Sequence, residues 1–170
     1  MFVLGIDPGL TRCGYGLVEA SFLGVESFRA VRAGTIETDH ETPVELRLGQ
    51  VLVEIRALLD ETTPDAVVVE RVFYQRNAKT AIPVAQASGV AVALAAASQI
   101  PVRQFNAQEV KLAVTGYGSA SKLQVQGMVA RLCGLAEIPK PADAADALAL
   151  AITYFMIVRS EQKYPTPSPV

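Results

Sequence analysis

A continuous apolar run, Ala66 to Val69, lies in the middle of the chain between Asp65 and Glu70. A run of this length and composition is typical of a strand that is buried on both faces of a sheet, and such strands are normally covered by helices. The run therefore predicts a layered fold with helices on both sides of a sheet. It also ends in a carboxylate, Glu70, which is costly to bury unless a positive charge neutralises it.

The flanking segments predict the remaining strands and helices. Residues 2–6, 14–19 and 30–37 are expected strands that lie close enough in the chain for hairpin connections, and "PVRQF" at 101–105 is a further short strand. Helical spacing or composition predicts helices at 43–59, 78–99, 108–114, 122–133 and 140–158. Three hairpin strands followed by alternating helices and strands predict an α/β fold: a mixed five-stranded sheet, antiparallel and then parallel, with helices on both faces.

Length and composition predict one domain. The chain has 170 residues, of which 51% are hydrophobic, and this is enough to bury one core. We expect the domain to span residues 1–158 and the proline-rich segment 159–170 to be a disordered tail. The alanine-rich segment 81–97 contains proline, glutamine and serine, so it fits a buried, close-packed helix better than a membrane span.

The residue types exclude several kinds of catalytic site. His40 is the only histidine, so neither a His–Cys zinc site nor a Ser-His-Asp triad can form. Cys13 and Cys133 have no paired or metal-type spacing, and no basic and apolar leader precedes the first strand, which predicts a cytoplasmic protein. Catalysis in this chain must use carboxylates, lysine or hydroxyl groups.

Charge is distributed unevenly along the chain. Residues 1–70 carry 12 acids and 5 bases, whereas residues 71–131 carry 7 bases and only one acid, Glu109. A basic middle segment is compatible with a phosphate-binding face, and equally with an ordinary solvated surface.

Four carboxylates have an unusual sequence context. Asp7 ends the first strand within "GIDPG", Glu70 ends the buried strand, and Asp143 and Asp146 are three residues apart and share one face of a helix. Three of them have structural alternatives: "GIDPG" is a typical turn sequence, Arg71 could pair with Glu70, and Asp143 could cap its helix. Asp146, flanked by alanine and leucine on an otherwise apolar helix, has no comparable alternative.

Convergence of these carboxylates would require a divalent cation. Mg²⁺ and Mn²⁺ prefer oxygen ligands, and a cluster of four carboxylates can hold two such ions. Two ions suit attack on a phosphodiester, because one lowers the pKa of the attacking water and both stabilise the entering and leaving oxygens. The hypothesis is therefore a nuclease that needs no histidine.

Several longer motifs occur in a fixed order over residues 2–155: "LGIDPG" followed by "TRCGYG", then "VVVERVFYQRNAKTA", "GSASKLQVQGMV" and "ADAADALALAIT". Together they resemble the RuvC family of bacterial Holliday junction resolvases, in the RNase H-like superfamily. The resemblance implies an RNase H-like fold with Asp7, Glu70, Asp143 and Asp146 as the metal-binding catalytic carboxylates. It also implies two Mg²⁺ ions, replaceable by Mn²⁺, and paired symmetric nicks in four-way junctions that leave 5′-phosphate and 3′-hydroxyl ends during recombination and DNA repair.

The resemblance also assigns residues to DNA binding. Lys122 is expected to assist catalysis, because a flexible ammonium can balance charge on the reacting phosphate, and the aromatic ring of Phe73 is expected to stack on an unpaired base at the junction centre. Structural alternatives are an exposed lysine that opens a helix and a ring that packs in a core or an interface. The expected DNA contacts are Phe73, Tyr74, Arg76, Lys79, Lys111 and Lys122.

Junction symmetry suggests a homodimer. Two nicks related by a two-fold axis need two active sites, the resembled family is dimeric, and the small residues of 85–97 could allow close approach at an interface. Family membership further implies cooperation with the branch-migration proteins RuvA and RuvB, and no membrane partner is expected.

Two other functions remain open from the sequence. One is an RNase H-like nuclease that acts on RNA/DNA hybrid or RNA, since a preference regarding the 2′-hydroxyl cannot be inferred from these residues. The other is a non-catalytic junction-binding protein, although four acids would hinder binding to a polyanion. A sugar kinase or actin-like ATPase is less compatible, because that architecture needs two such domains.

Overall fold

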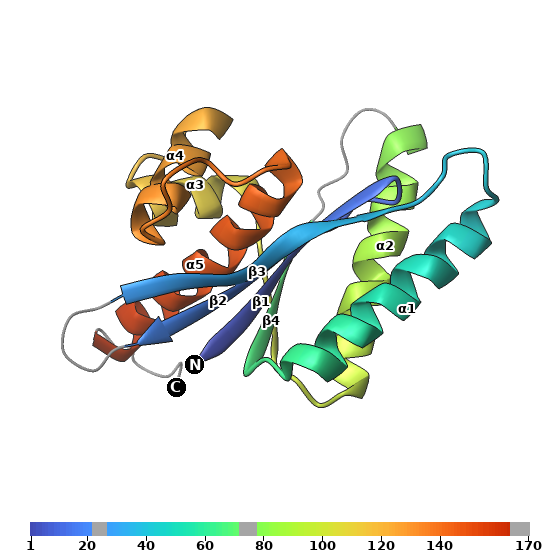
Figure 1. The fold of residues 1–170 in the computed structure, drawn as a ribbon, viewed down its shortest axis with the longest axis horizontal. Helices are drawn as coiled ribbons and strands as arrows, with labels where there is room; N and C mark the ends of the chain where they lie inside the picture. Colours follow the sequence, from blue (N-terminus) through green and yellow to red (C-terminus); the bar gives the residue numbers. More distant parts are fainter. Residues whose placement is uncertain (22–26, 72–77, 164–170) are drawn as a thin grey trace, which may run out of the picture.

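The computed structural model describes residues 1–21, 27–71 and 78–163, in which a five-stranded sheet lies between two groups of helices (Figure 1). The strand order is β3-β2-β1-β4-β5, with β1, β2 and β3 antiparallel and with β4 and β5 parallel to β1. This is the mixed sheet that the sequence predicts. In chain order the elements are β1 (Phe2–Asp7), β2 (Arg12–Ser21), β3 (Ser27–Glu37), α1 (Val44–Thr62), β4 (Ala66–Glu70), α2 (Ala78–Ala97), β5 (Val102–Phe105), α3 (Ala107–Thr115), α4 (Lys122–Leu132) and α5 (Ala142–Lys163).

Apolar side chains fill both sides of the sheet, because successive residues of a strand point to opposite faces. Val3 and Val68 belong to the core under α3, α4 and α5, whereas Ile6 and Val69 belong to the core under α1 and α2. All four residues of the run 66–69 have no exposed surface. The prediction of a doubly covered strand is therefore confirmed.

Helix α5 packs directly on the backbone of β1 and β2, at positions where those strands carry glycine. A β-carbon at Gly5 would lie 2.0 Å from the carbonyl oxygen of Ala147, and one at Gly14 would lie 2.2 Å from the carbonyl oxygen of Asp143. Only the absence of a side chain permits this approach. Because Gly14 is the strand partner of Asp7, the contact brings the first turn of α5 to the carboxyl end of β1.

Helix α2 differs most from its prediction. Ala87 and Ala91 are buried against the sheet, but Gly89 and Ala93 on the other side of the helix are exposed. Within a single chain, the expectation of a buried helix is therefore met only on the side that faces the sheet. Hydrophobic composition alone does not distinguish a side chain in the core from one on an apolar surface.

The other elements occur where the sequence predicts them, with ends that shift by a few residues. Strand β2 begins at Arg12 rather than at Gly14, and α5 continues to Lys163. Residues 164–170 of the expected tail lie outside the described residues. In the described ranges, every helix is too short or too polar to cross a bilayer.

We predict that Gly5→Ala destabilises the protein by about 3 kcal/mol or more, because the new methyl group would overlap the α5 backbone. Gly49→Ala is the matched control: Gly49 lies in α1, and a β-carbon there meets no atom within 4 Å. The control should gain about 0.5–1 kcal/mol from helix propensity. Urea unfolding of both variants measures the difference, and equal stability would contradict the close packing of α5.

Candidate metal centre

Asp7 and Glu70 lie side by side at the carboxyl ends of neighbouring strands. Ile6 of β1 pairs with Val69 of the parallel strand β4, so the next residue of each strand is a carboxylate. By strand alternation both carboxylates point to the face of the sheet that α5 covers. Each is only half-buried, at the point where a fully buried strand reaches the sheet edge.

Helix α5 adds two further carboxylates to this edge. Asp143 lies in its first turn and Asp146 lies three residues later, on the same face. One carboxylate oxygen from each of Asp7, Asp143 and Asp146 lies within 4.8 Å of the other two. Since α5 already begins at Ala142, Asp143 is inside the helix and is not its N-cap. The expected convergence of distant acids is therefore present.

Burial and like charge raise the pKa of two of these carboxyl groups. Burial, followed by the charges of Glu70 and Asp146, raises the pKa of Asp7 to about 8. Burial also raises the pKa of Glu70, which accepts a hydrogen bond from the protonated Asp7. At neutral pH the metal-free protein therefore keeps a proton on Asp7. A cation bound here would favour the ionised carboxylate and release that proton.

The donor set of this cluster fits a hard divalent cation. All of its ligand atoms are carboxylate oxygens, which suit ions of the Mg²⁺ and Mn²⁺ type, whereas zinc sites usually include nitrogen or sulfur. The raised pKa of Asp7 is consistent with the same conclusion, because a buried carboxyl group with two acids beside it ionises more readily once positive charge is present.

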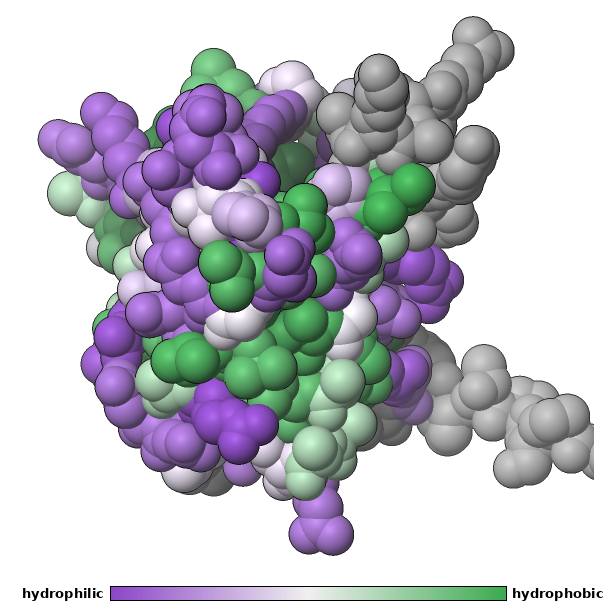
Figure 2. All heavy atoms as spheres, turned by 90° about the vertical axis from the view of Figure 1, so that its right-hand side faces the viewer, coloured by the Kyte–Doolittle hydropathy of each residue, from purple (hydrophilic) through white to green (hydrophobic). Residues whose placement is uncertain are grey.

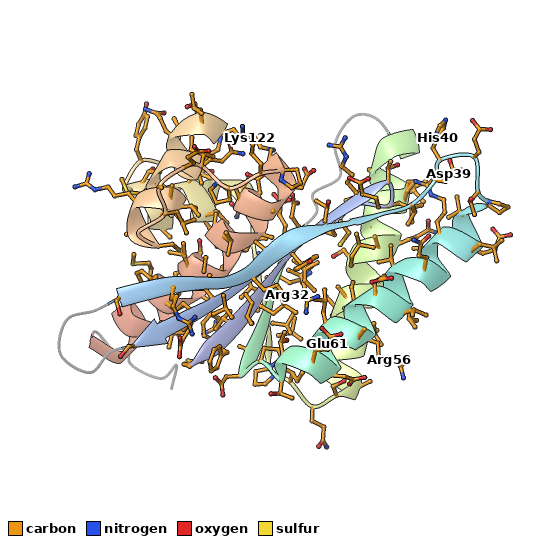
Figure 3. The ribbon with its side chains drawn as sticks, viewed as in Figure 1. Arg32, Asp39, His40, Arg56, Glu61 and Lys122 are labelled. Atoms are coloured by element: carbon orange, nitrogen blue, oxygen red, sulfur yellow. The ribbon has the colours of Figure 1, made fainter. Side chains whose placement is uncertain are left out.

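Lys122 supplies positive charge from α4. Its Nζ lies 2.5 Å from Oδ2 of Asp146, and the side chain stands at the first residue of the helix (Figure 3). The hydrogen bond with Asp146 raises the pKa of Lys122, so the amine is charged at neutral pH. One turn later, Nε2 of Gln126 donates to Oδ1 of Asp146 at 3.3 Å. The lysine does open a helix and is exposed, but it also neutralises an acid of the cluster.

Arg12 is a second cation beside the cluster, and the sequence analysis did not single it out. Its Nη1 lies 3.8 Å from Oδ2 of Asp143, and its Nε lies 3.7 Å from Oε1 of Glu37. Arg12 and Gly14 are two residues apart on β2, so they share the face that α5 covers. Alternation within "TRCGYG" was the signal that could have placed Arg12 there.

A cavity of about 330 Å³ opens beside the carboxylates. Asp7, Glu70 and Asp146 line it together with Lys111 and Lys122, and apolar residues of α3, α4 and α5 form the rest of its wall. Two of the three lysines that the sequence analysis selected, Lys111 and Lys122, thus line the same cavity as the acids. Of the other selected residues, Phe73, Tyr74 and Arg76 lie outside the described residues, and Lys79 lies in α2 with no described side chain.

This sheet, with carboxylates at the ends of its two central strands and on the helix across them, defines a nuclease of the RNase H-like class. The family model for crossover junction endodeoxyribonuclease RuvC matches residues 3–154. The chain belongs to this family of metal-dependent nucleases.

Known relatives and solved structures agree with this assignment. A crossover junction endodeoxyribonuclease RuvC from Leifsonia xyli subsp. xyli is 56% identical over 154 residues, which cover 89% of this chain and 72% of the relative. Thermus thermophilus RuvC superposes with a TM-score of 0.87 at 34% identity, covering 94% of this chain and 96% of that one. A structure of T. thermophilus RuvC in complex with Holliday junction substrate has a TM-score of 0.85 at 32% identity, with the same coverage. The RNase H-like fold prediction is confirmed.

We predict that the metal-free protein loses stability as the pH rises from about 4 to about 8. The pKa of Asp7 is raised from 3.8 to about 8 on folding, so between these values the folded state binds more protons than the unfolded state. Stability therefore falls with rising pH over this window. Asp7→Asn, which cannot ionise, should stabilise the metal-free protein at pH 8 by about 1–3 kcal/mol.

Urea unfolding in chelator at pH 5 and pH 8 measures this effect. Asp60→Asn is the control, because Asp60 is an exposed carboxylate on α1. A wild-type protein that is equally stable at both values, or an Asp7→Asn variant that behaves like the control, would contradict the prediction.

Proposed function

We propose that this protein is a Mg²⁺-dependent, structure-selective endodeoxyribonuclease that resolves four-way DNA junctions in homologous recombination and DNA repair. It makes paired symmetric nicks and leaves 5′-phosphate and 3′-hydroxyl ends. The observation that carries the proposal is the cluster of Asp7, Asp143 and Asp146 beside Glu70 on this sheet. Its relatives are named crossover junction endodeoxyribonucleases, and one RuvC structure contains a Holliday junction substrate. We assign the activity to the cytoplasm.

The proposed catalytic residues are the four carboxylates, which hold two Mg²⁺ ions that Mn²⁺ can replace. When bound, the ions activate a water molecule and stabilise the charge on the entering and leaving oxygens of the phosphodiester. Asp7 must lose its proton to act as a ligand, so its hydrogen bond to Glu70 is given up at the same time. The site is therefore expected to load more readily at higher pH.

Lys122 and Lys111 are proposed to act on the DNA backbone. Lys122 assists catalysis, because its ammonium group stands 2.5 Å from Asp146 and can balance charge on the reacting phosphate. Lys111 lines the same cavity and contacts the junction backbone. Both lysines are thus positioned by helices that border the carboxylates.

The segment after Glu70 is proposed to recognise the junction itself. Phe73 stacks on an unpaired base at the junction centre, and Tyr74, Arg76 and Lys79 make further DNA contacts. The support is their order in the chain: aromatic and basic side chains follow a catalytic carboxylate within a few residues. DNA distorted at a crossover would then be favoured over a plain duplex.

A second nick requires a second site, and we propose a homodimer. Figure 2 shows a largely hydrophobic area on the face formed by α1 and α2. A groove between these helices runs through this area, and the small residues of α2 leave room for close approach of another backbone. The groove is lined by Leu48, Leu52, Gln86, Gly89, Val90, Ala93, Leu94 and Ala97.

Two further proposals rest on the sequence and on family membership. Residues 1–158 act as one nuclease domain, and residues 159–170 have no catalytic role, although α5 continues through the first five of them to Lys163. RuvA and RuvB supply the junction by branch migration and cooperate with this protein.

We predict that the purified protein nicks a labelled four-way junction at symmetric positions in Mg²⁺, and that chelator abolishes the cutting. Asp7→Asn and Asp146→Asn should each lower the rate by about a thousandfold or more, because they remove metal ligands. Junction binding should persist in both variants, and Asp60→Asn should cut like the wild type. Degradation of RNA/DNA hybrid instead of the junction would favour the RNA-directed alternative, and junction binding without any cutting would favour a non-catalytic protein.

We predict that Ala93→Arg converts the dimer to a monomer, because the charge would be buried in the apolar interface. Ala93 is exposed within the groove, so the substitution leaves the core intact. Leu112→Arg is the control, since Leu112 is 57% exposed on α3, across the sheet. Sedimentation at micromolar concentration measures the change, and a wild-type monomer or an unaffected Ala93→Arg dimer would refute this interface.

A further inference from the structure

Asp143 and Asp146 each have a cation of their own. Nζ of Lys122, from α4, lies 2.5 Å from Asp146, and Nη1 of Arg12, from β2, lies 3.8 Å from Asp143. The two aspartates share one face of α5, so positive side chains from two different elements stand beside the carboxylate cluster. Lys122 has a role in the proposed function, whereas Arg12 has none.

Arg12 is not firmly bound to either acidic neighbour. Its N–O distances of 3.8 Å to Asp143 and 3.7 Å to Glu37 are longer than a hydrogen-bond distance, and 60% of its side chain is exposed. Within the described residues its guanidinium makes no hydrogen bond, whereas Arg29 donates twice to Glu19, at 2.9 and 2.6 Å. Exposed pairs this loose contribute little free energy, so the donors of Arg12 remain available to an incoming anion.

The turn that presents Arg12 is held by a buried hydrogen-bond network. Arg47 of α1, which is only 8% exposed, donates to Oγ1 of Thr38 at 2.8 Å and to Oγ1 of Thr11 at 2.7 Å. Thr38 in turn donates from its hydroxyl to the carbonyl of Leu10 at 2.5 Å and from its N–H to the carbonyl of Thr11 at 3.1 Å. Leu10 and Thr11, the two residues before Arg12, are therefore held in place by hydrogen bonds from Thr38 and Arg47.

Arg47 also adds charge to this corner of the molecule. In the described part of the chain its partners are hydroxyl groups only, and it has no acidic partner. A buried guanidinium without a counter-ion keeps much of its field, because the protein interior screens charge less than water does. The surface around Thr11 and Arg12 is therefore suited to an anion.

We propose that Arg12 binds a backbone phosphate of the DNA next to the scissile bond, and that Asp143 is its partner only while DNA is absent. This inference rests on the proposed function, since it takes the cleaved strand to lie over the carboxylates. Lys122 and Arg12 then hold the strand from two sides of the cluster. A phosphodiester is the expected ligand, because its two free oxygens match the guanidinium donors and because the proposed reaction brings this anion to the site.

Cation binding and phosphate binding are then linked through Asp143. A cation on the Asp143 carboxylate competes with Arg12 for the same oxygen, so loading of the site weakens the 3.8 Å contact and frees the arginine. A phosphate that occupies Arg12 likewise leaves Asp143 free for a cation. Binding of the cation therefore strengthens binding of the phosphate, and binding of the phosphate strengthens binding of the cation, without a movement of the fold.

The test compares Arg12→Gln and Arg12→Lys with the wild type and with Arg29→Gln, which removes an exposed arginine from the far end of the same β-ribbon. Affinity for a synthetic four-way junction and for a linear duplex is measured over a salt series in Ca²⁺, with intact DNA verified on a gel. Arg12→Gln should weaken binding about tenfold and reduce the slope of log affinity against log salt by about 1. Arg12→Lys should restore the slope, and Arg29→Gln should leave it unchanged.

A second readout separates phosphate binding from a structural role. Calorimetric titration with Mn²⁺, without DNA, should show equal or tighter binding in Arg12→Gln, since a competitor for Asp143 has been removed, and the unfolding temperature should not change. The inference would be overturned if Arg12→Gln bound Mn²⁺ more weakly than the wild type. It would also be overturned if Arg12→Gln kept the wild-type salt slope on DNA that the wild type binds. Either result would leave the proposed function standing. A wild-type protein that binds junction no better than duplex would overturn the proposed function instead, and the slope on duplex would still test Arg12.

Discussion

The contact between helix α5 and the backbone of β1 and β2 determines where the acids of this protein meet. Gly5 and Gly14 leave the space into which the helix fits. A β-carbon at these positions would lie only 2.0 and 2.2 Å from carbonyl oxygens of α5. Since Gly14 is the strand partner of Asp7, the first turn of α5 is fixed at the carboxyl end of β1. The close packing that stabilises the sheet therefore also gathers the carboxylates. A change in how α5 packs on β1 and β2 would move the carboxylates apart.

Gathering these acids opposes stability, and the structure reduces that cost in several ways. Asp7 retains a proton because burial and its neighbours raise its pKa to about 8, and that proton is shared in a hydrogen bond with Glu70. Lys122 neutralises Asp146 at 2.5 Å, and Arg12 stands near Asp143. A proton and two side chains thus offset the negative charge of the cluster. A chain adapted for stability alone would not keep such a cluster, which is why its presence argues for function.

The sequence was sufficient to predict most of the elements and the acids of the site. The apolar run 66–69 identified the central strand, because a strand without polar residues must be covered on both faces. Asp146 was identifiable because a carboxylate that interrupts an apolar helix lacks an ordinary structural role. Asp7, Glu70 and Asp143 had structural alternatives, and the family motifs around them selected them. Arg12 was overlooked because an arginine beside a turn is common. For α2 the sequence supported both a buried helix and an interface helix, because small apolar residues suit either environment.

By itself, the amino-acid sequence determined the order and type of the elements and the alternation of side chains along each strand. Periodicity, turn residues and side-chain alternation act over a few neighbouring residues, so they can be recognised without knowing the fold. Only the tertiary structure decided that β4 lies beside β1 and that α5 crosses their ends, because these contacts join residues far apart in the chain and depend on how all the layers pack. The spacing of the carboxylates, the retained proton on Asp7 and the loosely held guanidinium of Arg12 are consequences of that packing.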